Sequence, residues 1–89
     1  MTTQQVEEFG FTHVKEINGV FYAICRFIFT TGLVVGIDEI GYESRYCYLN
    51  HVDAVKALEE WDGIGDPPGN WIKQKGAGDR SNPNYEPNI

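Results

Sequence analysis

The longest apolar stretch of the chain, residues 20–38, predicts a β-hairpin around which the rest of the fold is organised. It is rich in β-branched and aromatic residues, and residues 30–32 (Thr-Thr-Gly) interrupt it with a turn signal. We expect a three-residue loop there, because that register pairs Cys25 with Ile37 and keeps one face wholly apolar. This inner face would carry Phe21, Ala23, Cys25, Phe27 and Phe29.

Shorter segments on either side predict two more strands. Residues 11–17 alternate between polar and apolar, and Asn18-Gly19 favours a type I′ turn into the central hairpin. Residues 45–49 predict a fourth strand, in which Arg45 would face Asp38 across the ladder. The pattern leaves open whether Cys47 or the neighbouring tyrosines face the core. The sequence thus predicts a four-stranded antiparallel β-meander.

One helix is predicted over residues 51–61, between an N-cap at Asn50 and a C-terminal stop at Gly63. We expect it to pack on the inner face of the sheet. Its apolar stripe would consist of Val52, Val55 and Leu58, with Ala54 and Trp61 close by. Residues 4–9 predict no more than a turn of helix in a frayed lead-in.

The composition changes after the helix. Residues 62–76 are rich in Gly, Pro and Asn but contain Trp71-Ile72, which predicts a structured loop anchored by the tryptophan. Residues 77–89 are polar and contain two prolines, which predicts an extended or disordered tail. The expected fold is therefore α+β, with a four-stranded antiparallel meander, one helix on one face, and a Trp-anchored C-terminal loop in a domain of residues 1–76.

The second face of the hairpin is too apolar to be left to water, and one short helix covers only one face. This outer face would carry Tyr22, Ile24, Ile28 and Val34. Either Trp71-Ile72 folds back over it, or a second copy of the chain packs against it. We expect both to contribute, which gives a homodimer.

Charge and hydropathy exclude several classes of protein. The 89 residues carry a net charge of −6, which argues against a nucleic-acid binder, since such proteins present a basic face. No segment approaches the roughly 20 apolar residues of a membrane span. The first residues lack the basic and apolar regions of a signal peptide. We therefore expect a cytoplasmic protein.

The metal-ligating residue types do not form a recognisable site. His13, His51, Cys25 and Cys47 are too far apart in sequence for any zinc module, whose cysteines are typically two to four residues apart. The cysteines are interpreted as buried thiols. We expect no metal and no cofactor.

Three charged residues of the outer face, Arg26, Asp38 and Arg45, could cluster as an anion or carboxylate site. The alternative, which we favour, is a cross-strand ion pair. The candidate binding residues are Tyr22, Arg26, Asp38, Arg45, Tyr46, Tyr48 and Trp71.

Because no catalytic set is evident, we expect a small binding or interaction module for a protein or a small molecule. One alternative is a small enzyme with a shared site at a homodimer interface. Such a site would use Arg26, Asp38, Tyr46 or His51. Another alternative is an acidic inhibitor that mimics nucleic acid and binds a basic partner.

Four segments carry a family resemblance: residues 26–36 (RFIFTTGLVVG), 41–43 (GYE), 45–48 (RYCY) and 61–76 (WDGIGDPPGNWIKQKG). In them the chain resembles a group of small uncharacterised bacterial proteins, some carried on mobile elements such as integron gene cassettes. The resemblance implies a compact, cytoplasmic accessory protein of bacterial origin. It implies no activity and no catalytic residues.

Overall fold

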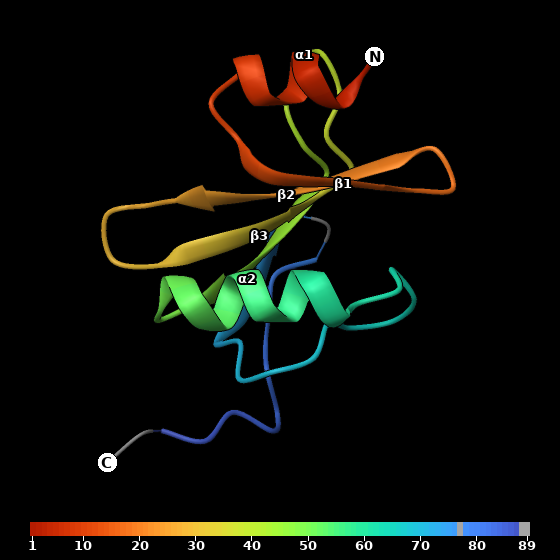
Figure 1. The fold of residues 1–89 in the computed structure, drawn as a ribbon. Coiled ribbons are helices and arrows are strands. Elements are labelled where there is room, and N and C mark those ends of the chain that lie inside the picture. The colour runs from red at the N-terminus through yellow and green to blue at the C-terminus, as the bar shows by residue number, and fades with distance from the viewer. Residues whose placement is uncertain (77, 88–89) are drawn as a thin grey trace.

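Six antiparallel strands follow one another in chain order within residues 1–76 and 78–87, which the structure, a computed structural model, describes (Figure 1). The antiparallel α+β class with one main helix is confirmed, but the sheet has six strands rather than four. The elements are α1 (Thr3–Glu8), β1 (Thr12–Ile17), β2 (Val20–Arg26), β3 (Thr31–Val35), β4 (Ser44–Tyr48), α2 (His51–Glu60), β5 (Lys73–Gly76) and β6 (Arg80–Ser81).

The predicted register of the central hairpin is wrong. The loop comprises residues 27–30, closed by a hydrogen bond from the Phe27 amide to the Thr30 carbonyl (2.8 Å), and Cys25 pairs with Gly32 instead of Ile37. Gly32 lies inside β3 and does not adopt the left-handed conformation that the predicted turn requires. A Cβ at this glycine would lie 2.6 Å from the Phe27 ring, so the glycine makes room for that ring.

In this register each β3 side chain lies on the face of the sheet opposite to the predicted one, because side chains alternate along a strand. Leu33 and Val35 now share a face with Tyr22 and Ile24. The two-residue turn at Asn18-Gly19 is confirmed: both residues have positive φ angles, 51° and 82°.

The predicted ladder pair between Asp38 and Arg45 is also wrong. Arg45 lies opposite Val34. Asp38 lies in the β3–β4 loop, where its carboxylate accepts hydrogen bonds from the amides of Ile40 (2.8 Å) and Gly41 (2.9 Å). These bonds form a local turn that competes with strand pairing and lengthens the loop.

The two faces of the sheet are covered by different helices, α1 on one side and α2 on the other (Figure 1). The prediction that the main helix covers the face of Phe21 and Ala23 is wrong, because α2 packs on the opposite face. The α2 side of the core contains Tyr22, Ile24, Leu33, Tyr46, Tyr48, Ala54, Ala57, Leu58, Trp61 and Trp71. The α1 side contains Val6, Phe21, Ala23, Val34 and Ile37.

Helix α1 instead covers the predicted inner face, that of Phe21 and Ala23, while Tyr22 and Ile24 of the predicted outer face lie in one core cluster with α2 and Trp71. A capping box between Thr2 and Gln5 starts α1, and Val6 is fully buried against the sheet. The capping residues are visible in the sequence. A single buried side chain, however, is too weak an apolar pattern to predict a helix that contributes to the core.

Helix α2 buries the predicted apolar stripe except for Val52. Ala54, Ala57 and Leu58 face the sheet, whereas Val52 is exposed. Asn50 occupies the N-cap position, although its side chain makes no capping hydrogen bond.

The segment after α2 is more regular than predicted. The loop expected over residues 62–76 ends in β5, which pairs with β4. Part of the tail expected over residues 77–89 forms β6, which pairs with β5; residues 77, 88 and 89 lie outside the described part. The domain boundary predicted at residue 76 thus falls between two paired strands.

Candidate functional site

Four of the predicted binding residues, Tyr22, Tyr46, Tyr48 and Trp71, meet in one aromatic cluster on the α2 side of the sheet. The Tyr46 and Trp71 rings pack edge to face with centroids 5.0 Å apart, and Tyr22 packs in the same way on Trp61. All four predicted residues are at most 6% exposed. The cluster is core, and its side chains are not available to a partner at the surface.

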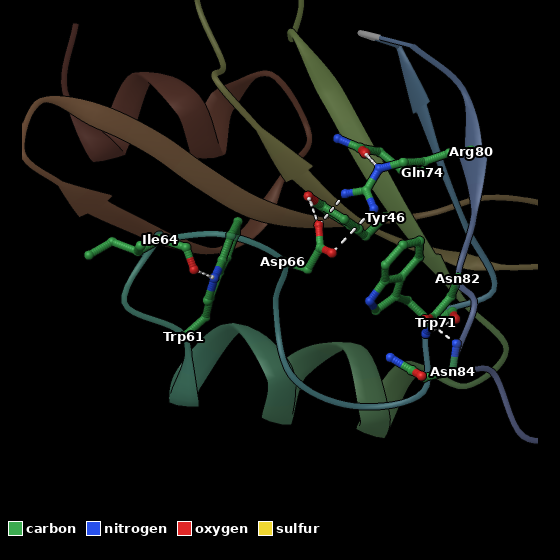
Figure 2. Close-up of polar contacts among 9 residues, drawn as sticks. All are labelled: Tyr46, Trp61, Ile64, Asp66, Trp71, Gln74, Arg80, Asn82 and Asn84. Carbon is green, nitrogen blue, oxygen red and sulfur yellow. Dashed lines mark hydrogen bonds and ion pairs between the residues drawn. The ribbon is translucent and has the colours of Figure 1, made fainter.

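A polar network closes one side of this cluster (Figure 2). The Tyr46 hydroxyl donates to Asp66 (3.0 Å), and the Arg80 guanidinium pairs with both oxygens of the same carboxylate while it lies over the Trp71 ring. The hydrogen bond from Arg80 lowers the pKa of Asp66, and burial raises the pKa of Tyr46. Both carboxylate oxygens are occupied, so the network serves to attach β6 to the core.

Arg26, Asp38 and Arg45 do not form the cluster that we considered. Arg26 lies on the α2 side of the sheet, whereas Arg45 lies on the α1 side, over the Phe27 ring (4.3 Å to its centroid). The Arg45 guanidinium donates to the Tyr42 hydroxyl (2.6 Å). Asp38 stays in its loop, where the amides of Gly41 and Ile40 lower its pKa.

Arg26 instead lies beside two histidines. Its Nε donates to Nδ1 of His51, the first residue of α2 (3.2 Å), and the His13 ring of β1 meets the His51 ring at 5.7 Å between centroids. Three elements thus bring three basic side chains together. The sequence did not reveal this, because the contacts join residues far apart in the chain.

A β-bulge places His13 in this group. Thr12 pairs with Ile24 and Lys15 with Tyr22, so β1 has one extra residue between these two pairs. His13 has a φ of 54°, a conformation that is uncommon for residues other than glycine. Bulges often redirect a side chain at a functional site.

The protonation of His51 follows from its surroundings. Burial, the Arg26 charge and His13 all lower its pKa. The neutral ring can accept the Arg26 hydrogen bond at Nδ1, which leaves its proton on Nε2.

Two cavities share Arg26 and His51. One, of about 380 Å³, also includes Thr12, His13 and Cys25 in its lining. The other, of about 200 Å³, lies under the hairpin loop and includes Phe29 and Leu49 in its lining.

The loop above the smaller cavity is apolar and exposed. Ile28 is 89% exposed and Phe29 is 87% exposed at the tip of the β2–β3 hairpin, and Leu49 beside them is 56% exposed. We call Ile28, Phe29 and Leu49 the apolar tip. Together with Arg26 and His51 it forms the candidate binding surface.

Within residues 1–76 and 78–87, no three His, Cys, Asp or Glu side chains are placed to hold a metal ion, and both cysteines are free thiols. Neither of the two described helices is long and apolar enough to cross a membrane. No protein-family model, curated protein or solved structure matches the chain.

Proposed function

We propose that the protein is a small binding module that uses the apolar tip to contact a partner protein. The observation that carries this proposal is the exposure of Ile28 and Phe29 side by side at the end of the hairpin. Side chains of this size gain about 1.5–3 kcal/mol each when they are fully buried. Two adjacent ones, with Leu49 nearby, provide a compact apolar anchor for a complex.

The hairpin loop is held in place before any partner binds. The Phe27–Thr30 hydrogen bond closes it, and the Phe27 ring packs against the guanidinium of Arg45. A preordered loop loses less conformational entropy on binding than a flexible one. This supports recognition by a rigid tip.

The charges around the tip favour an acidic partner segment. Arg26 and His51 line the cavity under the loop, and its lining contains no aspartate or glutamate. The rest of the chain is acidic, with a net charge of −6. A segment with an apolar residue next to a carboxylate would match both the tip and these basic groups.

The expected homodimer, and the alternative of an enzyme with a shared site at its interface, receive less support. Helices α1 and α2 cover both faces of the sheet, so the need for a second copy to cover an apolar face is removed. Of the residues considered for a shared active site, only Arg26 and His51 are in contact. Tyr46 is buried against Asp66, and Asp38 lies in a distant loop.

Selection from a random peptide library displayed on phage tests the proposal. We expect the purified protein to enrich peptides that contain an aromatic or aliphatic residue next to Asp or Glu. The double variant I28S/F29S should lose this enrichment, because it removes the apolar anchor while it leaves the strands intact.

Ile40 provides a matched control, since it is 98% exposed and lies in the β3–β4 loop, away from the hairpin tip. The Ile40→Ser variant should enrich the same peptides as the unmodified protein. Enrichment that persists in I28S/F29S, or that selects basic peptides, would overturn the proposal.

A further inference from the structure

The larger cavity beside the Arg26–His51 pair has one arginine, two histidines and no carboxylate in its lining. His13 from β1, Arg26 from β2 and His51 from α2 surround it, together with Thr12 and Cys25. A volume of about 380 Å³ falls within the range of small-molecule pockets, about 300–1,000 Å³. The space is therefore large enough for a ligand, and its lining sets the chemistry that the ligand needs.

The positive charge of Arg26 is not neutralised within the described part of the chain. The hydrogen bond from Nε to His51 is its one contact to a polar side chain there, and no carboxylate lies within salt-bridge distance. Its two terminal nitrogens are therefore free to bind a ligand. Arg80, by contrast, is paired with the Asp66 carboxylate.

His13 contributes to the cavity through a costly backbone conformation. The Thr12 hydroxyl donates to the Ile24 carbonyl (3.3 Å), so its oxygen can accept a hydrogen bond from His13 Nδ1 (3.0 Å). This contact fixes the ring at the bulge. Residues in sparsely populated backbone regions are concentrated at functional sites, where the conformation serves a purpose.

We propose that this cavity binds an oxyanion, a phosphate or carboxylate group, between the Arg26 guanidinium and the imidazoles of His13 and His51. A guanidinium presents parallel N–H groups that match two oxygens of such a group. A metal ion would be repelled by Arg26, which is hydrogen-bonded to the His51 ring. The proposal concerns the cavity and does not depend on a protein partner at the apolar tip.

Binding should be coupled to the uptake of protons. The groups that face the cavity are His13 from β1, Cys25 and Arg26 from β2, and His51 from α2, and none of them is acidic. An anion favours the charged form of His51, which counteracts the effects of burial and of Arg26 on its pKa; the protonated ring then no longer accepts the Arg26 hydrogen bond at Nδ1. Affinity should therefore rise as the pH falls from 8 to about 6, through the usual range of histidine titration.

Titrations followed by NMR test this site, with the imidazole and guanidinium signals as probes. Sulfate serves as the phosphate-like probe because its charge stays constant over this pH range, and acetate serves as the carboxylate probe. Sodium chloride keeps the ionic strength constant. We expect saturable shifts of the His13, Arg26 and His51 signals, with tighter binding at pH 6 than at pH 8.

Arg26→Gln should weaken binding by about tenfold or more, the effect expected for loss of a charge-assisted hydrogen bond. Arg26→Lys should have an intermediate effect, because it keeps the charge but loses the planar fork. Lys73→Gln is the matched control, since it removes one positive charge from an exposed position on β5, outside the cavity.

Saturable binding of sulfate alone would identify a phosphate-type site, and binding of acetate would identify a carboxylate site. Both results support the proposal. It would be overturned if neither anion gave saturable shifts, if affinity did not depend on pH, or if Lys73→Gln weakened binding as much as Arg26→Gln.

Discussion

The ammonium group of Lys15, in the first strand, donates a hydrogen bond to the carbonyl of Trp61 at the end of α2 (2.6 Å). The same group also donates to the Leu58 carbonyl (3.0 Å). The last carbonyls of a helix carry partial negative charge and lack partners within the helix. This lysine therefore caps a helix that lies more than 40 residues away in the sequence.

Replacement of Lys15 by Met should lower the free energy of unfolding by about 1.5–3 kcal/mol, the range for hydrogen bonds to a charged group. Urea denaturation followed by tryptophan fluorescence measures this, since Trp61 and Trp71 are both buried. Lys73→Met is the control, because Lys73 is exposed. Equal midpoints for the two variants would contradict the capping role.

Gly76 should be one of the least replaceable residues of the sheet. It has a φ of 116°, and an added Cβ would lie 2.5 Å from the carbonyl oxygen of Glu43. Because a backbone atom cannot move aside easily, Gly76→Ala should cost more than about 2 kcal/mol. Gly41→Ala is the control, since Gly41 has an ordinary φ and open space around it. Thermal unfolding should show a large loss for the first variant and almost none for the second.

The Asp66–Arg80 pair should stabilise the fold near neutral pH and lose this effect at acidic pH. The folded-state pKa of Asp66 is lowered by Arg80, so the carboxylate stabilises the fold above its unfolded pKa. This contribution disappears as the pH falls through the folded-state pKa. It should be about 1 kcal/mol or less, because both side chains are more than 40% exposed.

Urea unfolding of Asp66→Asn and the unmodified protein at pH 6 and pH 3 measures this effect. The difference in stability between them should be largest at pH 6 and shrink at pH 3. Glu59→Gln, at an exposed position on α2, should show no such pattern. A difference that grows as the pH falls would show that the pair does not act in this way.

Because of the bulge at His13, we expect an unusual order of stability among variants at this position. Because its φ is 54°, glycine should be tolerated better than alanine, by about 0.5–1 kcal/mol. Both substitutions remove the imidazole, so the difference between them isolates the backbone effect. Thermal unfolding of His13→Gly and His13→Ala measures it, and an alanine variant at least as stable as the glycine variant would argue against the left-handed conformation.

The features that the sequence predicted correctly depend on local signals. Asn18-Gly19 specifies its own turn, and the helix of residues 51–60 follows from its periodicity and propensity. The expected class of fold followed from these elements.

The features that were missed depend on contacts between distant residues. The hairpin register depends on the space that Gly32 leaves for Phe27, and one wrong pairing assigned β3 to the wrong face. The site around Arg26 needs a bulge at His13 and the start of α2 in the same place. Neither spacing nor residue type reveals these relationships.

The order of the strands places β1 and β6 at the two edges of the sheet. An exposed edge can pair with the edge of another molecule, which leads to aggregation. The bulge at His13 interrupts the ladder of β1, and β6 is only two residues long. Both edges are therefore poor templates for further strands, which helps to keep separate copies of the chain from joining into a continuous sheet.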